Sequence, residues 1–184
     1  KMATFEEQGL ALNKEIINLH ELVQQVLKSM KLQFEKYGAY LTPAPLPGER
    51  GNAAPLSPGR GVGGEVRPRG EVLADRIHLT NVVYNLLDNA LKYSHQNPQI
   101  GVQLTETEAE ISLSVSDNGI GIPAEYQSKI FEKFFRVPTG DTHNVKGHGL
   151  GLSYVASVIE QHGGRLKLQS EEGQGSTFTV VLPK

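Results

Sequence analysis

The first regular pattern in the chain is a helical stripe between Asn18 and Tyr37. Its apolar residues recur at intervals of three and four, as on the buried face of an amphipathic helix: Leu19, Leu22, Val23, Val26, Leu27, Met30 and Phe34. Asn18 followed by Glu21 fits a capping box, and Gly38 stands where a helix usually ends. The pattern therefore predicts one helix over 18–37, with a short strand before it at 15–17.

The remaining periodic segments are helices and paired strands. A second apolar stripe predicts a helix over about 75–93, and a third predicts a helix over about 149–162. Alternating runs predict two hairpins, 99–105 with 110–117 and 165–170 with 176–182. Together these elements predict an α+β fold, a two-layer α/β sandwich. Its mixed, mostly antiparallel sheet would have about five strands, covered by about three helices.

Residues 43–70 differ in composition from the rest of the chain. Six of the ten prolines and seven of the twenty glycines fall in these 28 positions. Such a segment offers too little apolar surface to offset the entropy of ordering it. We interpret it as a flexible insertion before a strand at 71–74. Its four arginines could bind an acidic partner, but a solvated linker is the simpler interpretation.

Overall composition excludes several classes of protein. The 184 residues suit one domain, and 38% hydrophobic with 21% charged residues is ordinary for a globular protein. The net charge of -2 argues against nucleic acid as a partner, and no apolar run is long enough to span a membrane, so we expect no membrane contact by this fragment. The absence of cysteine excludes disulfides and thiolate metal sites. Residues 1–12 lack the apolar core of a signal peptide.

The helix predicted over 75–93 carries a narrow polar arc opposite its apolar face. Asn85, Asn89 and Lys92 stand at i, i+4 and i+7, with Tyr93 beside them. An amide oxygen can complete the oxygen shell of Mg²⁺, and a lysine neutralises phosphate as a point charge. The arc therefore fits a metal-bound polyphosphate. A solvated polar face is the alternative, since every amphipathic helix has one.

Two further features suggest a ligand but have ordinary explanations. Strand period two places Asp117 on the same side as Ile111, Leu113 and Val115, where a carboxylate needs a hydrogen-bond donor such as a ligand amine. A simple Asp-Asn-Gly turn explains the same residues. The glycines at 147, 149 and 151 precede a helix, as in a phosphate cradle, although glycines there also serve as a hinge or a cap.

Five motifs in order make the pattern specific. They are Asn-Leu-Leu-Asp-Asn-Ala-Leu-Lys-Tyr at 85–93, Asp-Asn-Gly-Ile-Gly-Ile-Pro at 117–123, Phe-Glu-Lys-Phe-Phe-Arg at 131–136, Gly-His-Gly-Leu-Gly-Leu at 147–152 and Gly-Ser-Thr-Phe at 175–178. This set closely resembles the ATP-binding domain of sensor histidine kinases, of the Bergerat fold. The resemblance implies an ATP-binding catalytic domain over 13–184 with a mobile ATP lid. It also implies that residues 1–12 are the end of a dimerisation hairpin's second helix.

The resemblance assigns a role to each matching residue. Asn89 corresponds to the magnesium ligand, Asn85 to a residue beside the triphosphate, Lys92 to a phosphate-contacting base and Tyr93 to the wall against adenine. Asp117 corresponds to the carboxylate that accepts from the adenine amine, and Arg136 to the arginine that reaches the γ-phosphate. The other implied nucleotide-binding residues are Gly119, Gly121, Ile122, Phe131, Phe134, Gly147, His148, Gly149, Leu150, Gly151, Leu152 and Thr177. His148 stands where the family more often has a small hydroxyl residue.

The implied activity is that of a protein histidine kinase. With ATP and Mg²⁺ bound, Asn85, Lys92 and Arg136 would support transfer of the γ-phosphate to a histidine on a dimerisation hairpin that this fragment lacks. The phosphate would then pass to the receiver domain of a response regulator. The resemblance also implies a cytoplasmic location, either free or as the cytoplasmic portion of a membrane-anchored sensor. His20 lacks the proline that follows an acceptor histidine, so we expect it on a helix surface.

Two alternative functions remain at this point. One is a non-catalytic nucleotide-binding module of the same fold. The other is an ATP hydrolase of the gyrase, Hsp90 and MutL type, in which a glutamate activates water. Here Asn85 occupies the position of that glutamate, and an amide cannot act as a general base. Asp88 is a neighbouring carboxylate that could assist, but on the helix its side chain points about one residue step away from that of Asn89.

Overall fold

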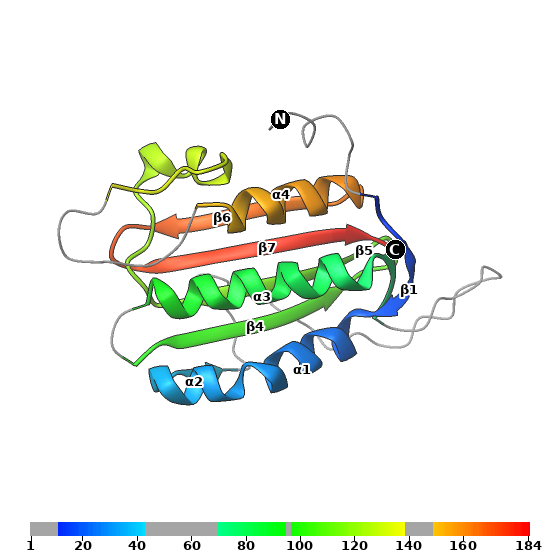
Figure 1. Cartoon of the computed structure of the whole chain (residues 1–184), viewed down its shortest axis with the longest axis horizontal. Helices are drawn as coiled ribbons and strands as arrows, with labels where there is room; N and C mark the ends of the chain where they lie inside the picture. The colour runs from blue at the N-terminus through cyan, green and yellow to red at the C-terminus, as the bar shows by residue number, and fades with distance from the viewer. Residues whose placement is uncertain (1–10, 43–69, 95–96, 139–148) are drawn as a thin grey trace, which may run out of the picture.

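A computed structural model describes residues 11–42, 70–94, 97–138 and 149–184. Most of the predicted insertion, most of the segment expected to form the lid, and residues 1–10 lie outside these ranges. Helices α1, α3 and α4 lie side by side over one face of a sheet (Figure 1). The two-layer α+β sandwich predicted from the sequence is therefore confirmed.

The main sheet has five strands in the order β2-β4-β5-β7-β6. Their bounds are Tyr40–Thr42, Gln99–Glu106, Glu110–Asp117, Gly175–Pro183 and Arg165–Glu171. Strands β4–β5 and β6–β7 form the two predicted antiparallel hairpins, and β2 pairs in parallel with β4. A separate antiparallel pair joins β1 (Glu15–Asn18) to β3 (Glu71–Ala74).

The single helix predicted over 18–37 is instead two helices. Helix α1 spans Leu19–Ser29 and α2 spans Lys31–Tyr37. They are separated at Met30, whose φ of -89° and ψ of 1° lie outside the α-helical range. Met30 is fully buried, so the apolar stripe continues across the break. Asn18 caps α1 as predicted, because its Oδ1 accepts from the Glu21 amide at 3.1 Å.

Helix α3 (Arg76–Lys92) lies between α1 and α4 (Gly151–Gln161), as Figure 1 shows. Asp75 caps α3, accepting from the His78 amide at 3.0 Å. The buried His162 ring connects the two helices: its Nε2 accepts from the Asp75 amide at 2.9 Å, and its Nδ1 donates to the Val158 carbonyl at 2.7 Å. Burial lowers the His162 pKa, which agrees with a neutral ring in this arrangement.

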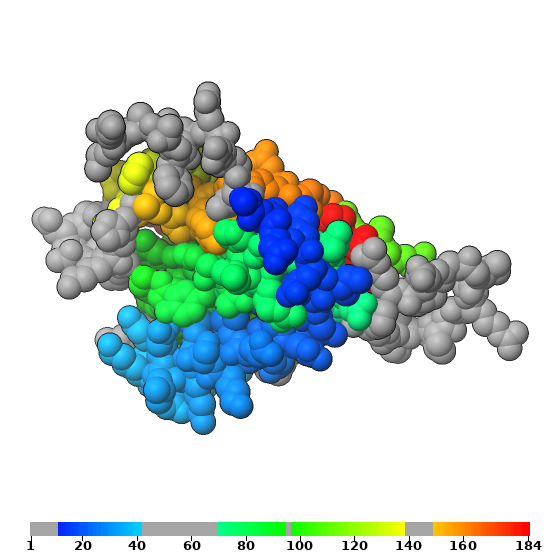
Figure 2. All heavy atoms as spheres, turned by 45° about the vertical axis from the view of Figure 1, so that its right-hand side comes forward, coloured from blue at the N-terminus to red at the C-terminus, as the bar shows by residue number. Residues whose placement is uncertain are grey.

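The core lies between the helices and one face of the sheet. Its fully buried side chains include Leu19, Leu22, Leu79, Leu86, Leu87, Ile100, Ile111, Leu113, Ile159 and Leu182. The opposite face of β5 and β7 is polar, with the Ser114 and Thr179 hydroxyls 2.9 Å apart. In Figure 2 the atoms of α3 lie between those of α1 and those of α4. Among the described residues, no helix is both long and apolar enough to cross a membrane.

Candidate nucleotide-binding site

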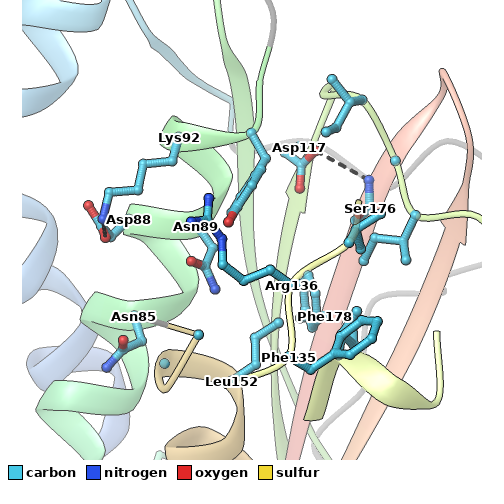
Figure 3. Close-up of a pocket in the computed structure, with 18 of the residues that line it drawn as sticks. Asn85, Asp88, Asn89, Lys92, Asp117, Phe135, Arg136, Leu152, Ser176 and Phe178 are labelled. Carbon is cyan, nitrogen blue, oxygen red and sulfur yellow. Dashed lines mark hydrogen bonds and ion pairs between the residues drawn. The ribbon is translucent and has the colours of Figure 1, made fainter. Parts of the chain in front are cut away.

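A cavity of about 380 Å³ opens where α3 and β5 end and α4 begins (Figure 3). Short 3-10 helices at Ala124–Tyr126 (η1) and Lys129–Phe131 (η2) lie in the segment that follows β5. The lining residues are Asn85, Asp88, Asn89, Lys92, Tyr93, Asp117, Ile120, Gly121, Ile122, Ile130, Phe135, Arg136, Val137, Gly149, Leu150, Gly151, Leu152, Ser176 and Phe178. The cavity thus brings together residues from all five motifs.

Helix α3 supplies the polar wall of the cavity. Its buried face holds Leu86, Leu87, Ala90 and Leu91, so the opposite arc turns Asn85, Asn89 and Lys92 to the cavity, as the helical spacing predicts. Asn85 is oriented by a 2.8 Å hydrogen bond from its Nδ2 to the Asn81 carbonyl. Its Oδ1 lies so near Gly151 that a Cβ added there would be 2.8 Å away. The first turn of α4 therefore packs directly against Asn85.

Asp88 also lines the cavity, although the sequence interpretation set it to one side. Its Oδ2 lies 2.5 Å from the Lys92 Nζ, with 25% of its side-chain surface exposed. The hydrogen bond that Lys92 donates to this carboxylate raises the Lys92 pKa, against the lowering effect of burial. An acid four residues before a lysine on the same helix was the signal for this pair.

Asp117 ends β5 on its buried side, as period two predicts. Its Oδ1 accepts from the Gly119 amide at 2.8 Å and from the Ser176 amide at 3.3 Å. Oδ2 accepts no hydrogen bond from the described residues. Burial raises the Asp117 pKa to about 6, and the two amides oppose that shift. Asp117 therefore makes the local turn and also presents a carboxylate oxygen to the cavity, so the two interpretations of this residue are compatible.

Gly119 and Gly121 are required by close backbone packing. A Cβ on Gly119 would lie 2.2 Å from the Tyr93 carbonyl oxygen, and one on Gly121 would lie 1.9 Å from the Glu171 carbonyl oxygen. Gly121 also has a φ of +66°, which side chains rarely adopt. Gly121 lines the cavity beside Ile122, whereas Gly119 does not. The role of Gly119 in this structure is to let the loop after β5 pass the end of α3.

The aromatic residues are arranged differently from the sequence assignment. Phe135 lines the cavity, while Phe131 packs at the edge of the core and Phe134 is 70% exposed. Phe134 has a φ of +65°, and its amide donates to the Gly149 carbonyl at 2.9 Å. This left-handed turn directs consecutive side chains outward and inward, and it cannot be deduced from the residue types alone.

The last strand motif and the glycine motif are only partly at the cavity. Ser176 and Phe178 line it, whereas Thr177 lies on the other face of β7, because successive side chains of a strand alternate. Gly149, Leu150, Gly151 and Leu152 line it as expected. Gly147 and His148 lie outside the described residues. Tyr93 and Arg136 lie at the cavity, and Figure 3 shows Arg136 extending across it towards Asn89.

The side chains at the cavity suit a metal ion that is held mainly by phosphate and water oxygens, with few ligands from the protein. In the described part of the chain, no three acidic or histidine side chains group closely enough to bind a metal ion by themselves. Asn89 offers an amide oxygen in a cavity large enough for phosphates and waters. Mg²⁺ commonly takes few protein ligands and several phosphate or water oxygens, so these residues fit it.

The comparisons with known proteins agree with this geometry. The profile of the family described as "Histidine kinase-, DNA gyrase B-, and HSP90-like ATPase" matches residues 74–184. Sensor protein RprX of Bacteroides fragilis is 34% identical over 185 residues, covering 100% of this chain and 32% of RprX. Sensor protein SrrB of Staphylococcus aureus is 37% identical over 110 residues, which are 60% of this chain and 19% of SrrB. The chain thus spans a third or less of these curated relatives.

Solved structures show the same fold. The catalytic domain of histidine kinase ThkA has a TM-score of 0.69 at 25% identity, covering 94% of this chain and 98% of that chain. A mycobacterial sensor histidine kinase, MprB, has a TM-score of 0.67 at 26% identity, covering 92% and 97%. The chain therefore belongs to the family of histidine kinase-, DNA gyrase B- and HSP90-like ATPases, and it is similar in sequence to sensor proteins and in fold to the catalytic domains of histidine kinases.

Proposed function

We propose that the domain binds Mg-ATP and transfers its γ-phosphate to a histidine on a dimerisation hairpin of the parent protein. One observation supports this most directly: the amide arc of α3 and the Asp117 carboxylate meet at one cavity. The carboxylate at one end of the cavity suits the adenine amine, and the amide oxygens and cations at the other end suit the metal-bound triphosphate.

Each side chain has a distinct task in this proposal. Asp117 accepts from the exocyclic amine of adenine, and Tyr93 forms the wall beside the base. Asn85, Asn89 and Lys92 face the triphosphate, where Mg²⁺ on Asn89 would offset part of the phosphate charge. Arg136 lies where a cation can stabilise charge on the transferred group. Backbone amides from 149–152 complete the phosphate side.

Transfer to a histidine is favoured over hydrolysis of ATP. Asn85 cannot take a proton from water, and the carboxylate of Asp88 is engaged by Lys92. Without a base to activate it, water attacks the γ-phosphate slowly. An imidazole nitrogen is a stronger nucleophile, so transfer to a histidine is favoured. Sustained phosphate release by the isolated domain would favour the hydrolase alternative.

The partners follow from the proposed chemistry. We propose the hairpin as the first phosphate acceptor and a response regulator receiver domain as the second. Histidine kinase ThkA has been solved in complex with the response regulator protein TrrA. ATP as donor would place the reaction in the cytoplasm.

Supplying the missing acceptor tests the function. With radioactive γ-phosphate on ATP, the domain alone is expected to stay unlabelled, because the proposed acceptor histidine lies on the hairpin, whereas His20 belongs to α1 of the domain itself. Adding the parent's hairpin, expressed separately, is expected to give acid-labile phosphate on the hairpin. ATP binding without any transfer would instead favour the non-catalytic module. Label on His20 would contradict its assignment to the surface of α1.

The insertion predicted over 43–70 is expected to be dispensable for ATP binding. Its composition favours solvent over a packed core, and it enters from the edge strand β2 and returns through Gly70 before β3. Replacing 43–69 with a short Gly/Ser loop should leave Mg-ATP affinity within about twofold, a change of roughly 0.4 kcal/mol. Gly70 stays in the variant, because its carbonyl accepts from the Leu19 amide at 2.8 Å. Unfolding or lost affinity would contradict the linker interpretation.

A further inference from the structure

The salt bridge between Asp88 and Lys92 lies beside the proposed phosphate site, yet the proposed chemistry uses only the lysine. Both side chains line the cavity, and the Lys92 Nζ is 2.5 Å from the Asp88 Oδ2. Figure 3 shows the lysine turned back along α3 to Asp88, whereas Asn89 points into the cavity. The ammonium proposed to meet phosphate is therefore already paired with a carboxylate.

The charges around the cavity make this pairing consequential. Its described lining has two carboxylates, Asp88 and Asp117, and two cations, Lys92 and Arg136. Asp117 lies at the proposed adenine end. Of the two carboxylates in the described lining, Asp88 is therefore the one that offsets the charge of the cations proposed to bind phosphate. A triphosphate without metal depends on protein cations to balance its charge, whereas a bound divalent cation supplies part of that balance itself.

We propose that Asp88 determines a preference for metal-bound over metal-free nucleoside triphosphate by holding Lys92 in this ion pair. The inference rests on the proposed function, in which the cavity binds Mg-ATP. A metal-free triphosphate must draw Lys92 away from Asp88 to gain its charge. A metal-bound triphosphate needs Lys92 less, so the pair costs it less affinity.

The geometry allows this effect to be separated from folding. The two side chains are 34% and 25% exposed, and an ion pair between residues four apart on a helix contributes little to stability. Asp88→Asn keeps the size of the side chain and removes the charge. The variant is therefore expected to fold normally and to release Lys92 for phosphate.

Titration calorimetry with ATP, in Mg²⁺ and separately in excess EDTA, tests the proposal. Asp88→Asn is expected to bind metal-free ATP roughly two- to fivefold more tightly than wild type, the range that corresponds to breaking a weak ion pair. Its gain for Mg-ATP should be smaller, so the preference for the metal-bound form narrows. Asp88→Glu retains the charge and should restore the wild-type preference.

Glu110→Gln is the matched control. Glu110 pairs with Arg165 at 2.5 and 2.7 Å, and it begins β5, the strand whose other end is Asp117. Seven residues of a strand span about 23 Å. This variant loses the same charge from an ion pair far from the cavity, so its metal preference should equal that of wild type.

A Lys92→Met background shows whether Asp88 acts through the lysine. There Asp88→Asn should bring little further gain, because no ammonium remains to be released. A full gain in that background would overturn the proposal, as would an Asp88→Asn variant with the preference of wild type. If wild type binds Mg-ATP but its preference is unchanged by Asp88→Asn, only this inference fails. If wild type binds no Mg-ATP, the proposed function fails together with it.

Discussion

Asn89→Ala is expected to remove most of the magnesium-dependent part of ATP binding. Asn89 faces the cavity from the last turns of α3, where its amide oxygen is the proposed protein ligand of the metal. Deleting that oxygen should weaken Mg-ATP by about 10- to 100-fold, or roughly 1.4 to 2.8 kcal/mol. Calorimetry in Mg²⁺ and in EDTA separates the metal-dependent affinity from the rest.

Asn81→Ala is the control for Asn89→Ala. Asn81 is an exposed asparagine two turns earlier on α3, and its side chain is not part of the cavity lining. The same truncation there keeps the main-chain carbonyl that orients Asn85. Its Mg-ATP affinity should match wild type. Unchanged affinity in Asn89→Ala as well would remove Asn89 from the metal site.

Asp117→Asn is expected to weaken ATP by about 1 to 3 kcal/mol, the contribution of a charge-assisted hydrogen bond. It should also narrow the preference for ATP over GTP, because an amide can turn its donor towards the guanine carbonyl whereas a carboxylate repels it. Competition titrations against a fluorescent nucleotide measure both effects, with circular dichroism to verify folding. Full affinity and full preference in the variant would reduce Asp117 to a turn residue.

The same carboxylate should make ATP binding depend on pH. Burial raises the Asp117 pKa to about 6, and only the ionised form accepts from the adenine amine. Wild-type affinity should therefore fall as the pH drops from 7.5 through 6, and this part of the pH dependence should be absent from Asp117→Asn. A profile that is equally steep in both proteins would assign the titration to another group.

In the absence of nucleotide, ionisation of Asp117 should lower the stability of the folded protein, although the same ionisation favours ATP binding. Its pKa is raised from 3.8 to about 6 on folding, so the folded protein favours the protonated form. The stability that this group contributes is present below pH 3.8 and is lost as the pH rises to about 6. The difference in unfolding free energy between wild type and Asp117→Asn should show this trend, because other carboxylates affect both proteins alike.

Local periodicity located the main polar groups of the site. The spacing of Asn85, Asn89 and Lys92 places them on one side of a helix whose other side is apolar, and a phase of two places Asp117 on the buried side of its strand. These features depend on near neighbours in the chain. They could therefore be predicted before any tertiary contact was known.

Other features depended on contacts between distant segments. Ser176 and Phe178, rather than Thr177, reach the cavity because the helices cover that face of β7. Phe135 replaces Phe131 and Phe134 there because Gly149 packs against a left-handed turn at Phe134. The break at Met30 likewise leaves the apolar stripe unchanged, so no periodic pattern marked it.

The sequence by itself determined the order of the two hairpins and of the helices around them, except for the break at Met30, together with the polar arc of α3 and the buried phase of Asp117. Each follows from a repeat of 3.6 or 2 residues within one element. Only the tertiary structure decided that Lys92 is paired with Asp88, that Phe135 lines the cavity and that Gly119 lies against the Tyr93 carbonyl. Those outcomes depend on side-chain rotamers, on one left-handed residue and on close packing between elements, none of which is encoded in a local repeat.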